Sequence, residues 1–219
     1  MKLKPNQDRA RYATICMYVM IVLSLSSLGF QYYSAHLGPL FMREDYDDLV
    51  FMALMVALIA VAITIIAAIF FIMWFRRAYY NLHQLSPGGL QHSEGWAAGA
   101  WFIPIFNFWG PYQIATDLFK ETELILVNNN LAEANPARHQ IKNWWWGLWI
   151  ASILLGRVEA YGENTSMSMA LLTTAISVAS AVLAILMIKS YHEMEILLPK
   201  ISAVTSDAIT DDDLLDSGL

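Results

Sequence analysis

The residues that could make or break bonds are few in this sequence, and their spacing does not form a catalytic pattern. His192 and Glu193 begin like a zinc-protease helix, but the position of the second histidine ligand is occupied by Ile196. The sequence has neither the serine elbow of the α/β-hydrolases nor the glycine-rich loop that holds phosphates. We therefore predict that the protein is not an enzyme, with no catalytic residue, no metal ion and no cofactor.

The histidines leave one alternative open. All five lie in predicted loops or at predicted membrane edges, where unpaired histidines are ordinarily surface residues. His83, His92 and His192 fall on one predicted side of the membrane and could share a metal ion. His83 and His92, together with Asp117 and Glu121, are also the only candidates for a lipid-modifying membrane enzyme, which is the least favoured class.

Residues 95–112 suggest binding rather than bond-making. Pro104 and Pro111 each lack a backbone N–H and interrupt helical hydrogen bonding. If the segment enters lipid, the freed carbonyls need partners in protein or water, so we expect it to pack inside a helix bundle or to line a wet cavity. Asn107, between the prolines, can donate and accept. The candidate binding residues are Arg77, Trp101, Pro104, Asn107, Trp109, Pro111 and Tyr112.

The elements that must position this segment are membrane helices. Hydrophobic residues make up 57% of the 219 residues and charged residues only 15%, against about 25% charged in soluble domains. Runs without charge predict four crossings, and three of them have an apolar centre of the roughly 20 residues that a membrane helix needs. The run at 143–156 has only 14 residues and reaches a spanning length if Arg157 and Glu159 extend to the far interface. They lie within helices at about 12–33, 49–85, 143–160 and 167–195. The expected fold is all-α, a polytopic membrane helix bundle of four transmembrane helices plus one Pro-broken element.

The Pro-broken element, residues 95–116, is long enough to be a fifth crossing, but its prolines favour a re-entrant or interfacial path. An amphipathic helix over 112–126 follows, because apolar residues recur there at helical spacing. With four crossings, eleven of the 13 lysines and arginines lie on the side of the two termini. The positive-inside rule then places both termini in the cytoplasm, and a fifth crossing would almost abolish this bias.

The chain is expected to form one transmembrane domain over residues 1–200, followed by an acidic mobile tail over 201–219. That tail holds five aspartates and no lysine or arginine, out of a net charge of −6. Two helices carry stripes of small residues at helical spacing, which favour close packing between helices or a homo-oligomer. The stripes are Ala53, Ala57, Ala60, Thr64 and Ala68, and Thr173, Ser177, Ala181 and Ala184.

The order of rare residues around the Pro-broken element resembles a known family. Arg77-Ala78-Tyr79, Gly95-Trp96, Trp101-Phe102-Ile103-Pro104, Asn107, Trp109 and Pro111-Tyr112 look like the bacterial domain-of-unknown-function 4328 family, over roughly residues 45–195. The resemblance implies a multi-pass protein of the bacterial inner membrane. It implies no activity and carries no functional residue to this chain.

Two functions from different classes remain at this stage. One is a binding, channel, transport or sensor protein with a cytoplasm-facing site near Pro104–Pro111, since broken helices at membrane depth recur in such proteins. The other is a scaffold or a subunit of an unidentified membrane partner, in which the prolines only turn a corner. The lipid bilayer is an expected partner of both, and nucleic acid of neither.

Overall fold

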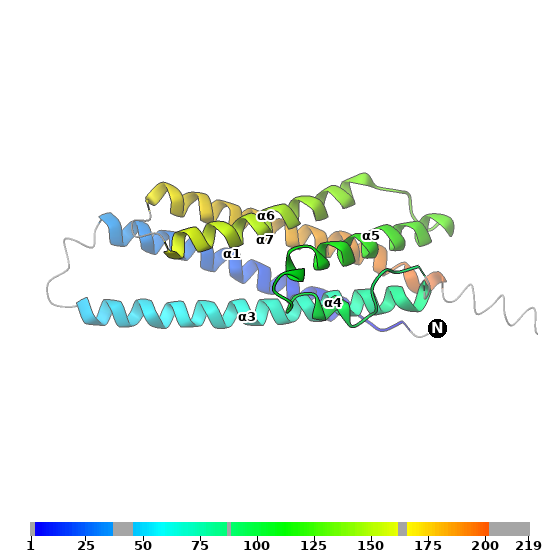
Figure 1. Cartoon of the computed structure of the whole chain (residues 1–219), viewed down its shortest axis with the longest axis horizontal. Helices are drawn as coiled ribbons and strands as arrows, with labels where there is room; N and C mark the ends of the chain where they lie inside the picture. Colours follow the sequence, from blue (N-terminus) through cyan, green and yellow to red (C-terminus); the bar gives the residue numbers. More distant parts are fainter. Residues whose placement is uncertain (1–2, 37–45, 87–88, 162–165, 202–219) are drawn as a thin grey trace, which may run out of the picture.

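The long helices of the protein run side by side along one axis (Figure 1). The computed structural model describes residues 3–36, 46–86, 89–161 and 166–201. In chain order the elements are α1 (Gln7–His36), α3 (Tyr46–Leu85), α4 (Trp96–Gly99), the 3-10 helix η1 (Phe106–Phe108), α5 (Gly110–Asn128), α6 (Pro136–Tyr161) and α7 (Met167–Glu195). The described residues are helical or irregular and contain no strand, which confirms the all-α class.

Four of these helices contain the segments that the sequence predicts as crossings. The expected helix 167–195 coincides with α7, and 12–33, 49–85 and 143–160 lie inside α1, α3 and α6. Helix α6 begins at Pro136, seven residues before the predicted crossing at 143–160. Proline is well suited to a first helical position, and the Asn135 side chain accepts the backbone N–H of Ala137 at 3.0 Å.

The core lies in one half of the bundle, which we call the aromatic half. It holds the start of α1, the end of α3, α4, α5, the start of α6 and the end of α7 (Figure 1). Large fully buried side chains gather there, among them Trp74, Phe75, Tyr79, Phe119 and Tyr191. Rings pack edge to face, as between Trp74 and Tyr191 with centroids 6.0 Å apart, a preferred aromatic geometry.

The other half of the bundle exposes apolar side chains in long runs on α1 and α3, such as Val22, Leu25, Val56 and Leu58. Water-soluble proteins rarely expose so much contiguous apolar surface. Within the described residues, three helical stretches are long and apolar enough to cross a bilayer, namely Gln7–Tyr33, Leu54–Leu85 and Met167–Ile201. The predicted fourth crossing, 143–160, is not among them. These helices are compatible with a membrane-embedded protein.

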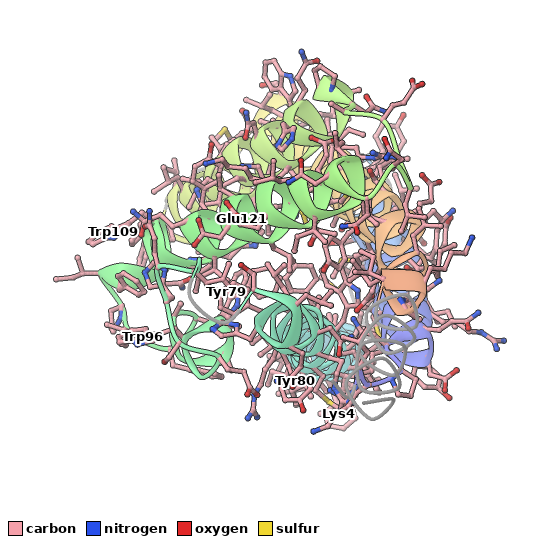
Figure 2. The ribbon with its side chains drawn as sticks, turned by 90° about the vertical axis from the view of Figure 1, so that its right-hand side faces the viewer. Lys4, Tyr79, Tyr80, Trp96, Trp109 and Glu121 are labelled. Atoms are coloured by element: carbon pink, nitrogen blue, oxygen red, sulfur yellow. The ribbon has the colours of Figure 1, made fainter. Side chains whose placement is uncertain are left out.

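The Pro-broken element projects from the side of the aromatic half. Figure 2 shows Trp96 and Trp109 on this projection, pointing away from the bundle. Its inner edge packs against the core through residues such as Ala97, Ala100, Trp101 and Phe106, while Phe102 is 74% exposed. Of the two expected environments, packing inside the bundle applies to the inner edge of the segment and not to Phe102.

Short turns explain why the outer edge needs no cover from other helices. The Asn107 backbone N–H donates to the carbonyl of Ile103 at 2.8 Å, and the Gln113 N–H donates to Trp109 at 3.0 Å. Pro111 lies in the first turn of α5, where its missing N–H interrupts no helical bond. Part of the backbone of the segment is thus hydrogen-bonded within the segment itself.

Candidate functional site

A cavity of about 330 Å³ lies between α1, α3, α6 and α7, beside the aromatic half. This volume falls within the range of small-molecule sites in proteins, roughly 300–1,000 Å³. Its walls are mostly apolar and include the flexible side chains of Met17 and Met20 and the ring of Phe71. Five hydroxyl side chains interrupt the apolar wall, contributed by all four helices: Ser24, Thr64, Ser152, Ser177 and Ser180.

Three of the hydroxyls are already used as donors within their own helices. Ser24 Oγ donates to the carbonyl of Met20 at 2.9 Å, Thr64 Oγ1 to Ala60 at 2.8 Å, and Ser152 Oγ to Trp149 at 2.7 Å. Each hydroxyl oxygen keeps lone pairs that can accept a further hydrogen bond. The O–H donors of these three groups are therefore already satisfied. Their oxygens can still act as weak acceptors for a bound molecule.

Tryptophans form the end of the cavity that meets the core. Trp101, from the Pro-broken element, packs edge to face against Phe71 and Trp149, with ring centroids 5.6 Å away in both cases. Trp145 and Trp149 line the cavity beside it. The indole Nε1 of Trp101 is buried and has no acceptor among the described residues. Because a buried N–H without an acceptor is unfavourable, this group is a natural donor to a ligand.

Of the seven predicted binding residues, only Trp101 lines this cavity. Pro104 and Trp109 are exposed, and Pro111 is buried at the start of α5. The Tyr112 hydroxyl donates to Asn143 Oδ1 at 3.0 Å. The remaining two, Asn107 and Arg77, are partly buried, and Asn107 Oδ1 has no partner among the described residues.

Several cavity-lining residues were not predicted as binding residues, although the sequence analysis had named them as parts of the small-residue stripes. Thr64 and Ala68 belong to one stripe of small residues, and Ser177, Ala181 and Ala184 belong to the other. These five residues line the same cavity. The stripes thus face a shared space in addition to any packing role. The hydroxyls within the stripes were the available signal, because tight apolar packing alone does not require them.

The histidines proposed as a shared metal site have separate surroundings. His83 Nδ1 lies 3.0 Å from the carbonyl of Tyr79, and His92 Nδ1 lies 3.9 Å from Asp117 Oδ2. His192 lines a different cavity. Within the parts of the chain that the structure describes, no three histidine, cysteine, aspartate or glutamate residues are grouped closely enough to hold a metal ion.

Two titratable groups lie beside the Pro-broken element, the buried Lys142 of α6 and the partly buried Asp117 of α5. Lys142, which precedes the predicted crossing, is only 2% exposed, and its ammonium donates to Thr116 Oγ1 and lies 4.3 Å from the Tyr112 ring centroid. Burial lowers the pKa of Lys142 to about 8, although the carboxylate of Asp117 acts in the opposite direction. Burial likewise raises the pKa of Asp117, opposed by His92.

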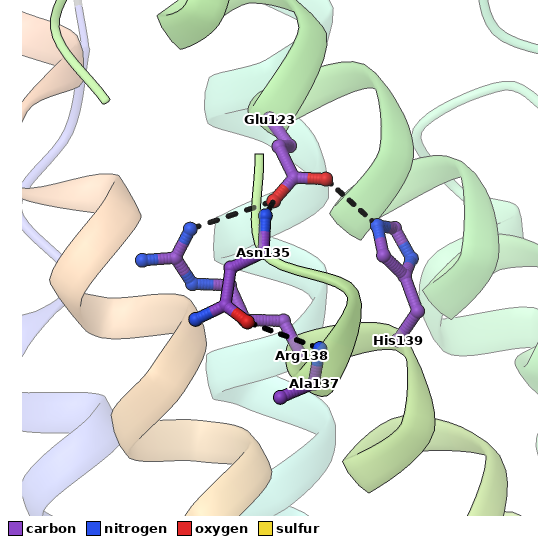
Figure 3. A network of polar contacts seen from close by, with 5 residues as sticks. All are labelled: Glu123, Asn135, Ala137, Arg138 and His139. Carbon is purple, nitrogen blue, oxygen red and sulfur yellow. Dashed lines mark hydrogen bonds and ion pairs between the residues drawn. The ribbon is translucent and has the colours of Figure 1, made fainter. Parts of the chain in front are cut away.

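The carboxylate of Glu123 in α5 holds the connection to α6 in place. Glu123 accepts the backbone N–H of Asn135 at 2.7 Å and the His139 ring N–H at 2.8 Å, and it lies 3.5 Å from the Arg138 guanidinium (Figure 3). Burial alone would raise the pKa of Glu123, but these hydrogen bonds and charges outweigh it and lower the pKa. The network positions α6, which carries three of the cavity residues, against α5.

The fold and the cavity define the class: an all-helical protein with three helices able to span a bilayer and a ligand-sized space between its long helices. The sequence profile described as Domain of unknown function (DUF4328) matches residues 43–193. The chain therefore belongs to this family, which confirms the resemblance carried by its tryptophans and prolines. No curated protein and no solved structure matches the chain.

Proposed function

We propose that this protein is an integral membrane protein that binds a small lipid-like molecule in the cavity between α1, α3, α6 and α7. The observation that carries the proposal is the lining of the cavity. An apolar wall with hydroxyl acceptors and one free indole donor at its aromatic end suits a mostly apolar ligand with a weakly polar group. Trp101 connects this site to the Pro-broken element.

The proposed topology has four crossings, with α6 as the fourth, and both termini in the cytoplasm. Its support is the distribution of eleven of the 13 lysines and arginines on that side. The exposed rings of Phe102, Phe108 and Trp109 suit an interfacial position, where aromatic side chains are enriched. The Pro-broken element then lies at the cytoplasmic interface of the inner membrane, beside the aromatic end of the cavity.

A cavity-filling substitution tests the proposal. Ala181→Phe places a ring at the cavity wall, whereas Val182→Phe, the next residue on α7, adds a ring at a position that is 42% exposed. The wild type and both variants are purified in the same detergent, and bound lipid-like molecules are extracted and quantified by mass spectrometry. We expect Ala181→Phe to lose about 90% of one stoichiometric species, with Val182→Phe retaining it.

Fluorescence gives a second measurement of the same site. Trp101, Trp145 and Trp149 line the cavity, so a brominated fatty acid that enters it should quench tryptophan emission in the wild type and in Val182→Phe. Quenching should be weaker in Ala181→Phe. Identical quenching and identical bound lipid in all three proteins would contradict the proposal and favour the alternative, a scaffold or partner subunit with no ligand of its own.

A further inference from the structure

A second cavity, of about 380 Å³, lies at the end of the aromatic half, separate from the first. It is formed by the segment before α1, the end of α3 and the end of α7 together with the residues after it. The polar side chains that line it are those of Lys4, Asn6, Gln7, Asn81, His192 and Glu195. The Glu195 residue is only 7% exposed, although carboxylates are almost never so buried without a charged partner.

The carboxylate of Glu195 is held by amides. Asn6 Nδ2 lies 3.1 Å from both carboxylate oxygens, and Asn81 Nδ2 donates to Oε1 at 2.9 Å. No lysine, arginine or histidine nitrogen among the described residues lies within 4.0 Å of it, since no salt bridge to Glu195 is formed. Among the described residues, the buried carboxylate has neutral hydrogen-bond donors and no cation in contact with it. The Arg77 guanidinium acts on it only from beyond ion-pair distance, so the negative charge is incompletely compensated there.

The one cation that lines the cavity is engaged elsewhere. The Lys4 ammonium lies 4.1 Å from the centroid of the Tyr80 ring, and Figure 2 shows these two side chains together at the end of the bundle. The backbone of Lys4 is fixed as well. Its N–H donates to Asn81 Oδ1 and its carbonyl accepts from Asn81 Nδ2, both at 2.9 Å. The segment before α1 is therefore anchored beside the carboxylate without neutralising it.

The cavity also contains polar atoms that have no partner. Asn6 is 4% exposed, and its Oδ1 is buried without a donor among the described residues. The Nδ1 atom of His192 is in the same state. An amide oxygen can only accept, and an imidazole nitrogen can accept when it is unprotonated. A ligand with several N–H donors and a positive charge would satisfy the carboxylate and the amide oxygen together.

We propose that this cavity binds a small organic cation of the primary-ammonium class, with Glu195 as its countercharge and Asn6 Oδ1 as a hydrogen-bond acceptor. The apolar side chains of Leu3, Ile196 and Leu198 on the cavity wall suit a short alkyl body. A bare metal ion fits less well, because the space far exceeds one ion and a single carboxylate supplies the charge.

The test uses the full chain in lipid nanodiscs and n-butylammonium chloride as the probe, by isothermal titration calorimetry at constant ionic strength. n-Butanol and sodium chloride are the neutral and inorganic controls. We expect saturable binding of n-butylammonium only, weakened at least about ten-fold in Glu195→Gln, which keeps the shape but removes the charge. Glu193→Gln, at an exposed position two residues earlier, should bind like the wild type.

Further variants separate this site from the first cavity and from a folding defect. Ala181→Phe should bind n-butylammonium normally, because it fills only the first cavity. Asn6→Leu should weaken binding if it folds, as judged by circular dichroism and gel filtration. If Glu195→Gln does not fold, the binding measurements on the wild type test the proposal. No binding there, equal binding of butanol, or displacement by magnesium at equal concentration would overturn the proposal, and so would unchanged binding in Glu195→Gln.

Discussion

Lys142 is buried in the contact between α5 and α6, although lysine is normally among the most exposed residues. Its ammonium keeps one hydroxyl partner, Thr116, and the face of the Tyr112 ring. Burial disfavours the charged form more in the folded protein than in the unfolded chain. The protein thus tolerates the unfavourably buried charge of Lys142 beside the Pro-broken element.

The pH dependence of stability should reveal this charge. Because the folded pKa of Lys142 is lowered from 10.5 to about 8, the unfolded chain binds more protons between these values, and stability should rise with pH across that window. Lys142→Met should remove that rise. At neutral pH, Lys142→Met should also increase the free energy of unfolding by about 1–2 kcal/mol and so raise the midpoint of thermal unfolding. An unchanged pH profile in Lys142→Met would show that the charge is not responsible.

Glu123 should give a dependence of the same sign in the acidic range, but there the charged form of the group stabilises the fold. Its folded pKa lies below the ordinary value of 4.5 for a glutamate, so its contribution to stability is complete above that value and is lost as pH falls through the lower folded pKa. Glu123→Gln should cost about 1 kcal/mol at neutral pH and nothing at strongly acidic pH. Thermal unfolding at several pH values measures this.

Glu133→Gln is the matched control for Glu123, because it changes an exposed carboxylate in the same connection between α5 and α6. It should leave the profile as in the wild type. An equal acid sensitivity in the wild type and in Glu123→Gln would place the responsible group elsewhere.

The Pro-broken element depends on a close approach between its 3-10 helix and the start of α5. A Cβ atom on Gly110 would collide with the ring of Phe106, and that ring packs edge to face against Trp96 with centroids 5.1 Å apart. The glycine at this junction is therefore needed for space. It lets the projecting segment fold back onto the helix that continues the chain.

Gly110→Ala should loosen the element without unfolding the bundle. We expect a loss of about 1–3 kcal/mol, typical of overpacking, and faster chymotrypsin cleavage at the aromatic residues of 96–109. Gly99→Ala in the same element is the control, since a Cβ there meets nothing within 4 Å. Cleavage of both variants at the same rate would contradict this account of the junction.

The whole molecule divides into an aromatic half with a compact core and a half that is apolar on its outside. The connection between α5 and α6 lies at the same end as the described start of the chain, while the end of α6 and the start of α7 lie at the opposite end (Figure 1). If the proposed topology holds, these two ends of the bundle are on opposite sides of the membrane.

Cysteine labelling in intact cells tests that arrangement. In a Cys16→Ala background, Asn130→Cys should resist a membrane-impermeant thiol reagent, and Ser168→Cys, exposed near the start of α7, should react with it. Both should react after the cells are opened. Labelling of Asn130→Cys from outside would contradict the four-crossing topology and the cytoplasmic position of the Pro-broken element.

The sequence alone determined the helices and the family. Apolar runs without charge marked α1, α3, α6 and α7, because helix length and periodicity are local properties. The prolines marked the break before α5 for the same reason. The rare, ordered tryptophans and prolines sufficed for the DUF4328 family. Sequence reasoning also named Trp101 as a candidate binding residue, and it lines the first cavity, although its binding role stays a prediction.

Only the tertiary structure decided which side chains share a site. The first cavity draws its walls from four helices, so residues interpreted as packing stripes became its lining. Glu195 meets Asn81 across 114 positions of the chain and Asn6 across 189. No local pattern encodes such contacts, because they arise from the angles and register at which finished helices pack.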